Sequence, residues 1–128
     1  MINEIRSRGH EIVAISGSSM GAMVGGMTAA GHLDEFSSWV SGLSRRDVLR
    51  LVDPHLSVPG VITAERLFAE IHAIAGDCRI EDFDISFTAV ATDLRARREV
   101  WFQRGELVSA LRASVAMPGV FTPVVLNG

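Results

Sequence analysis

One uncharged stretch, residues 12–31, restricts the folds open to this chain more than any other feature. It is long enough to cross a bilayer, yet it contains five glycines, three serines and a threonine, whereas membrane helices are richer in leucine and isoleucine. The apolar run 11–15 predicts a buried strand, covered on both faces as parallel strands are. A sharp turn over residues 16–21 and a small-residue helix over 22–30 follow. We therefore interpret the stretch as strand, turn and helix.

The rest of the chain alternates between helical and extended patterns. Apolar residues recur at helical spacing in five further places, which predicts helices at residues 2–5, 33–43, 48–51, 63–76 and 107–115. Strands are expected over 84–94 and 98–103, and the polar turn between them indicates an antiparallel hairpin. Residues 120–126 are expected to be extended. This order of elements predicts an α/β domain with a mixed sheet.

The composition of the 128 residues fits one compact domain and reduces the classes of ligand that the domain is expected to bind. Hydrophobic residues make up 48% and charged residues 21%, the balance of a globular core and not of disorder. The net charge of −3 provides no strong field for nucleic acid, so nucleic-acid binding is not expected. All twelve basic residues are arginine, and a Walker-type phosphate loop needs a lysine. A nucleotide-binding α/β module is therefore disfavoured.

Few side chains outside the turn suggest chemistry. Cys78 is the only cysteine, so it forms no intrachain disulfide, favours a reducing compartment such as the cytoplasm, and is expected to be an ordinary thiol. His32 is expected at a helix end and His72 on a helix beside Phe68 and Ile71, both in structural roles. No spacing of His, Cys, Asp and Glu indicates metal ligands. Neither a metal nor a cofactor is predicted.

The turn carries the one chemical motif of the sequence. Gly17-Ser18-Ser19-Met20-Gly21 fits G-x-S-x-G, the nucleophile elbow of serine hydrolases. A serine on so sharp a turn brings the residues two before and two after it together, and only glycine leaves room there. Ser19 alone has glycine on both sides at that distance, and the N–H of Met20 is the expected oxyanion donor. A glycine-rich turn without chemistry is the alternative interpretation.

Three stretches, taken together, resemble a known family. They are residues 15–26 (ISGSSMGAMVGG), 88–94 (TAVATDL) and 113–124 (ASVAMPGVFTPV). Their order and approximate spacing are similar to those of the bacterial patatin-like phospholipases, in the branch related to neuropathy target esterase. The resemblance implies a three-layer α/β/α fold with a mixed, mainly parallel sheet. It also implies a serine lipid acyl hydrolase acting on phospholipid, lysophospholipid or simple carboxylic esters.

The resemblance further implies a Ser–Asp dyad without histidine, in which Ser19 matches the nucleophile. The family's aspartate lies in an Asp-Gly-Gly or Asp-Gly-Ala motif shortly after the Pro-Val stretch, and its glycine-rich oxyanion loop precedes the first helix. Neither matches a residue here, and Asp93 matches a strand end with a structural role. We therefore expect residues 1–128 to be a partial patatin-like domain, truncated at both ends and inactive alone. The alternative is a catalytically dead remnant or binding module of the same fold.

The expected partners follow from the same resemblance, beginning with a lipid or ester substrate. Phe36, Trp39, Val40 and Leu43 would suit a lipid-facing patch near the site, with the protein peripheral at the membrane. The alternative is that this helix simply packs on the core. A parallel sheet without its first strand has an unpaired edge, so we expect the chain to self-associate or to be poorly soluble.

Overall fold

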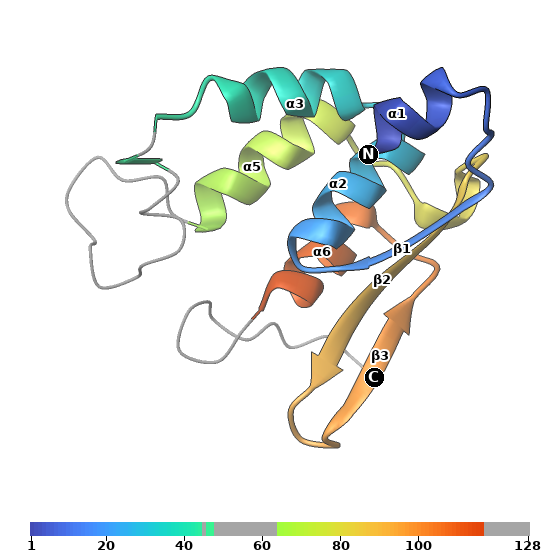
Figure 1. Cartoon of the computed structure of the whole chain (residues 1–128). Coiled ribbons are helices and arrows are strands. Elements are labelled where there is room, and N and C mark those ends of the chain that lie inside the picture. The colour runs from blue at the N-terminus through green and yellow to red at the C-terminus, as the bar shows by residue number, and fades with distance from the viewer. Residues whose placement is uncertain (45, 48–63, 117–128) are drawn as a thin grey trace.

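The computed structural model describes residues 1–44, 46–47 and 64–116 of the chain (Figure 1). In chain order its elements are α1 (Ile2–Ser7), β1 (Ala14–Ser18), α2 (Met20–Ala29), α3 (Leu33–Ser41), α5 (Ala64–Ala75), the 3-10 turn η2 (Ile80–Asp82), β2 (Ser86–Asp93), β3 (Arg98–Phe102) and α6 (Leu107–Val115). The helix predicted at 48–51 and the extended segment at 120–126 lie outside the described residues. The predicted α/β class, with an incomplete mixed sheet, is confirmed.

The described strands form an open sheet with β2 in the centre. β1 runs parallel to β2 from the pair Ala14–Ser86 to the pair Ser18–Val90. β3 runs antiparallel to β2, which confirms the predicted hairpin. Because parallel strands need a long crossover, α2, α3 and α5 all lie between β1 and β2 in the chain. The turn after Ser18 therefore lies at the carboxyl end of a parallel strand, where α/β proteins commonly place their sites.

The first strand differs from its prediction in position and in burial. β1 begins at Ala14 and continues to Ser18, because its residues keep pairing with β2 through the segment that was expected to be a turn. Ala14, Ser16 and Ser18 are exposed, whereas Ile15 and Gly17 are half-buried. The predicted burial on both faces is wrong for this strand, since the described helices cover only one face of the sheet.

The covered face is held closely against α2 and α6. A Cβ added to Gly25 would lie 2.6 Å from Ile15 Cγ2, and one added to Gly26 would lie 3.0 Å from Leu107 Cδ1. Phe87 of β2 contacts both glycine positions, so the small residues of α2 let the helix lie directly on the sheet. The largest fully buried apolar side chains of the core are Met23, Met27, Ile71, Leu107 and Leu111.

The apolar stripe of α3 packs on this core. Phe36 is 3% exposed, and Trp39, Val40 and Leu43 are partly buried against the core residues. The rings of Phe36 and Trp39 stack with their centroids 6.1 Å apart. In the described structure the stripe is thus a packing face, as in the alternative interpretation, and the lipid-facing patch stays a prediction. Among the described helices, none combines the length and the hydropathy needed to span a membrane.

Candidate active site

Ser19 forms the whole turn between β1 and α2. Its backbone has φ 52° and ψ −124°, a sparsely populated conformation for a residue with a side chain, which typically costs about 1–3 kcal/mol. Among the described residues, the other non-glycine at positive φ is Arg97, at the β2–β3 hairpin turn. Hairpin turns commonly use positive φ, but a strand that leads into a helix does not require it. The strain at Ser19 therefore belongs to an abrupt reversal of direction at this one residue.

Close backbone contact across the turn accounts for one of the two motif glycines. A Cβ on Gly17 would lie 2.5 Å from the carbonyl carbon of Gly21 and 2.7 Å from the nitrogen of Ala22. A Cβ on Gly21 would meet no described atom within 4 Å. The steric reason for glycine thus holds at Gly17 and is wrong at Gly21 in the described structure, because the first turn of α2 points that position outward.

The N-terminus of α2 lies at the candidate nucleophile. Ser19 is the N-cap, and its carbonyl accepts the first helical hydrogen bond, from the N–H of Met23 at 3.1 Å. The N–H of Met20, in the first turn, has no carbonyl of its own helix to which it could donate. The positive end of the helix dipole also lies here. The arrangement can therefore stabilise negative charge on an oxygen beside Ser19.

A buried hydroxyl that the sequence analysis did not select is joined to this turn. The backbone N–H of Ser19 donates to Ser114 Oγ at 2.9 Å, and the Ser114 hydroxyl donates to the carbonyl of Val90 at 2.6 Å. Ser114 lies in the last turn of α6 and is 7% exposed. The one sequence signal was its place in the stretch 113–124, which nothing in the local pattern linked to the elbow.

No described residue forms a hydrogen bond with the hydroxyl of Ser19. Asp93 Oδ1 instead accepts the backbone N–H groups of Arg95 at 2.9 Å and Ala96 at 3.0 Å, in the turn of the hairpin. The bond from Ala96 is the largest cause of a pKa below the usual range for the Asp93 carboxyl. These contacts agree with the structural role expected for Asp93. Ser16 and Ser18 are exposed on the helix-free side of β1.

His32, His72 and Cys78 have partners or surroundings of an ordinary kind. His32 Nδ1 lies 4.0 Å from a Glu35 carboxylate oxygen, and His72 Nε2 lies 3.5 Å from Asp77 Oδ1. Burial is the main cause that raises the pKa of the Cys78 thiol, which keeps it protonated and poorly nucleophilic at neutral pH. The structural roles predicted for His32 and His72 agree with these contacts, and the ordinary thiol predicted at Cys78 agrees with its raised pKa.

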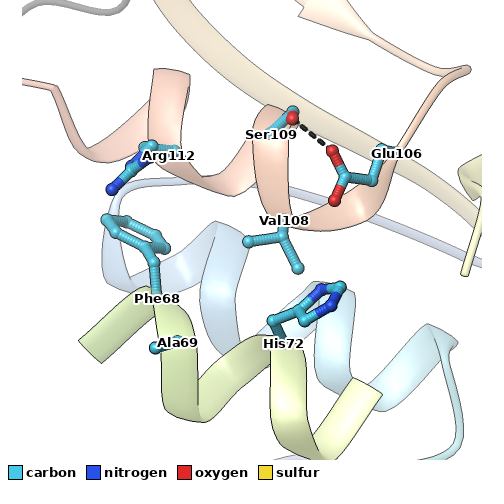
Figure 2. Close-up of a pocket in the computed structure, with 7 residues that line it drawn as sticks. All are labelled: Phe68, Ala69, His72, Glu106, Val108, Ser109 and Arg112. Carbon is cyan, nitrogen blue, oxygen red and sulfur yellow. Dashed lines mark hydrogen bonds between the residues drawn. The ribbon is translucent and has the colours of Figure 1, made fainter. Parts of the chain in front are cut away.

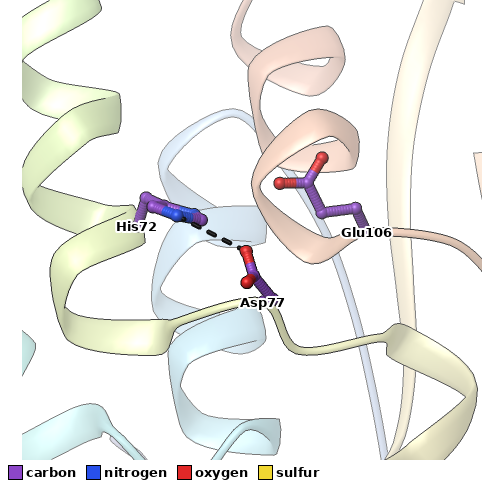
Figure 3. Close-up of side chains that lie close together, drawn as sticks. All are labelled: His72, Asp77 and Glu106. Atoms are coloured by element: carbon purple, nitrogen blue, oxygen red, sulfur yellow. Dashed lines mark ion pairs between the residues drawn. The ribbon is translucent and has the colours of Figure 1, made fainter.

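A second polar region lies between α5 and α6 and shares no residue with the elbow. An open hollow of about 360 Å³ lies there, and Figure 2 draws the residues that line it. The guanidinium of Arg112 lies 5.3 Å from the centre of the Phe68 ring. Two of the lining residues, His72 and Glu106, have ligand atoms that lie with that of Asp77 within 4.8 Å of one another (Figure 3). The sequence spacing did not indicate this cluster, because its members meet only after folding. All three side chains are exposed, and exposed groups of this kind do not by themselves form a metal site.

Comparison with known families identifies the proteins to which this chain is similar. Residues 2–128 match the family model described as patatin-like phospholipase. The chain belongs to the patatin-like phospholipase family. The family that its three sequence stretches resemble is therefore confirmed.

The relatives of this patatin-like chain come from bacteria and from eukaryotes. An uncharacterized NTE family protein of Mycobacterium tuberculosis (strain H37Rv) is 51% identical over 128 residues, which cover 100% of this chain and 36% of the relative. The corresponding Mycobacterium bovis protein gives the same values. Lysophospholipase NTE1 of Saccharomyces cerevisiae is 27% identical over 136 residues, which cover 100% of this chain and 8% of the yeast protein. The chain thus spans just over a third of the mycobacterial relatives.

Proposed function

We propose that this patatin-like chain carries the nucleophile of a serine lipid acyl hydrolase, and that Ser19 is that nucleophile. The observation that carries the proposal is the backbone of Ser19, a non-glycine residue held at φ 52° between a parallel strand and a helix N-terminus. The family supports a lipid or carboxylic ester as the substrate class. The name of the yeast relative supports a lysophospholipid among these substrates.

In the proposed reaction, Ser19 Oγ attacks the carbonyl carbon of the ester and its proton passes to a carboxylate base. The carbonyl oxygen becomes an oxyanion that the N–H of Met20 and the N-terminal end of α2 stabilise. Collapse of this intermediate breaks the bond to the alcohol, which leaves with the proton. Water then attacks the acyl-Ser19 ester, releases the fatty acid and restores the serine hydroxyl.

The proposal assigns the base to the aspartate of a Ser–Asp dyad, which no residue of this sequence matches. Residues 1–128 would then form a partial patatin-like domain without the glycine-rich oxyanion loop and the Asp-Gly-Gly/Ala segment. The hydrogen bonds that engage Asp93 in its hairpin turn support this assignment. We expect the chain alone to hydrolyse esters several orders of magnitude more slowly than a complete dyad would. A cytoplasmic location, inferred from the single thiol Cys78, is part of the same proposal.

The test is the intact mass of the chain after incubation with a fluorophosphonate, which phosphonylates activated serines. The wild type and the variants Ser19→Ala, Ser16→Ala and Ser18→Ala are compared over a series of pH values. We expect one adduct, formed slowly and faster at high pH, in every protein except Ser19→Ala. Release of fatty acid from a lysophospholipid should follow the same pattern at a much lower rate than labelling.

Two results would contradict the proposal. An adduct that persists in Ser19→Ala would place the reactive group elsewhere. No adduct at any pH would favour the alternative function, a catalytically dead remnant or binding module of the same fold. Binding of lysophospholipid micelles without turnover, equal in the wild type and in Ser19→Ala, would then describe what that module does.

A further inference from the structure

The described part of the chain buries two polar side chains, and they are satisfied in different ways. Thr28, which is 2% exposed, donates to the carbonyl of Val24 one turn earlier in its own helix at 2.6 Å. Ser114, which is 7% exposed, makes both of its hydrogen bonds to other elements. A helical serine can usually be satisfied by its own helix, as Thr28 is. The hydroxyl of Ser114 instead connects α6 to β2 and to the turn after β1.

The register of the sheet shows which interaction this hydroxyl replaces. In a parallel ladder a residue bonds to the two neighbours of the residue opposite it. The start of the ladder follows this rule, because Ser86 pairs with Ala14 and donates to the carbonyl of Val13 at 3.2 Å. At the other end Val90 pairs with Ser18, so the next ladder bond would run from the N–H of Ser19 to the carbonyl of Val90. Ser114 Oγ lies between these two groups.

We propose that Ser114 is a positioning residue of the elbow, whose hydroxyl takes the place of the last ladder bond and holds the Ser19 peptide away from β2. This inference rests on the proposed role of Ser19 as nucleophile. With the hydroxyl inserted, the chain leaves the sheet at Ser19 while its N–H and the Val90 carbonyl both remain hydrogen-bonded. The strained backbone of Ser19 is thereby fixed from the side of α6.

The geometry assigns Ser114 a positioning role and no part in proton transfer. Its proton is donated to Val90, and one of its oxygen lone pairs accepts the N–H of Ser19. Removal of the Ser114 oxygen has one of two structural consequences, and either of them changes the geometry of the elbow. Both backbone groups lose their partner in a part-buried place, or the Ser19 peptide closes onto Val90 and moves the nucleophile toward the sheet.

The test compares three variants of this chain. Ser114→Ala removes the hydroxyl, Ser114→Thr keeps it, and Thr28→Val removes the other buried hydroxyl from the elbow helix without touching the turn. For each protein the fluorophosphonate labelling of Ser19 is resolved into a reagent dissociation constant and a maximal rate. Amide hydrogen exchange of Ser19, measured by NMR, provides a readout that needs no reactivity.

We expect Ser114→Ala to lower the maximal labelling rate at least about tenfold with little change in reagent affinity, since small displacements of a nucleophile have large effects on rate. The Ser19 amide should exchange at least about tenfold faster relative to the amides of β2. Ser114→Thr should restore both quantities, and Thr28→Val should change neither.

Equal labelling and equal Ser19 exchange in Ser114→Ala and Thr28→Val would overturn the positioning role. A wild type that forms no fluorophosphonate adduct would contradict the proposed function. The amide hydrogen exchange rate of Ser19 would then be the one measurement that decides the role of Ser114. The two failures are thus distinguishable.

Discussion

Gly17 packs so closely against Gly21 that a Cβ on Gly17 would lie 2.5 Å from the Gly21 carbonyl carbon. The relation is one-sided, since a Cβ on Gly21 would meet no described atom within 4 Å. Although the motif is symmetrical, the close backbone contact that requires glycine at position 17 is absent at position 21 among the described residues. Gly17 allows the strand to reverse into the helix, whereas the described structure would accept a side chain at position 21.

Gly17→Ala should destabilise the chain, whereas Gly21→Ala should not. The first forces the backbone of the turn apart and should lower the free energy of unfolding by about 3 kcal/mol. The second replaces glycine in the first turn of α2 and should be neutral or stabilising by up to about 1 kcal/mol. Urea denaturation of the two variants and the wild type measures the difference. Equal destabilisation by both would contradict the one-sided packing.

Close contact between α2 and β1 predicts a coupling between Gly25 and Ile15. Alanine at position 25 gains about 1 kcal/mol of helix propensity but would place its Cβ 2.6 Å from Ile15 Cγ2, so a net loss of about 1–3 kcal/mol is expected. In an Ile15→Ala background the same substitution should cost clearly less. A double-mutant cycle in urea gives the coupling energy, and simple additivity of the two changes would show that they do not touch.

The strained backbone of Ser19 predicts that glycine at this position stabilises the chain. Ser19→Gly relieves the cost of φ 52° and should raise the free energy of unfolding by about 1 kcal/mol, while Ser19→Ala should not. Ser18→Gly, in the neighbouring strand, is the control and should lower it by about 0.5–1 kcal/mol. Thermal unfolding of the three variants decides the matter. No gain in Ser19→Gly would mean that the turn is unstrained.

The carboxylate of Glu81 links the turn before β2 to the start of α6, and it predicts a dependence of stability on pH. Its own backbone N–H, then the N–H of Gly105 at 2.7 Å and the side chain of Arg79, lower the pKa of Glu81 from 4.5 to about 2. A depressed carboxyl pKa stabilises the folded state above the unfolded pKa, and this contribution is lost as the pH falls from about 4.5 toward 2.

Glu81→Gln should accordingly lower the urea midpoint at pH 7 and approach the wild-type value at pH 2. Asp82→Asn, at the adjacent exposed carboxylate, is the matched control and should show no such convergence. A difference between Glu81→Gln and the wild type that stays constant across this range would indicate that the charge of Glu81 is unimportant.

The sequence predicted the features that depend on local pattern. Apolar spacing located the helices that the structure describes, and alternation located the hairpin, because each pattern reflects the face that a single element buries. The elbow was recognisable because its glycines and Ser19 lie within five residues. The one-sided burial of β1 was not predicted, since a run of apolar residues cannot tell which faces will be covered. Ser114 was missed because its contact with Ser19 spans 95 positions of the chain.

The helix-free side of the sheet gives the predicted self-association a specific location. β1 and β3 are the edges of the described sheet, and Trp101 on β3 is 61% exposed. It lies opposite Val90 and so shares the face turned away from the helices, because the residues on either side of Val90, Ala89 and Ala91, are buried beneath them. An unpaired edge strand of the described sheet that carries an exposed tryptophan is suited to pairing with a second copy.

Light scattering at increasing concentration should therefore detect dimers or larger species of the wild-type chain. Trp101→Lys should shift the population toward monomer, since a charged side chain on an edge strand opposes pairing. Leu94→Lys is the matched control, because Leu94 is an exposed apolar residue, 49% exposed, that lies in the hairpin turn outside the strands. A monodisperse wild-type monomer would contradict the prediction. Equal effects of the two substitutions would place the contact away from the sheet edge.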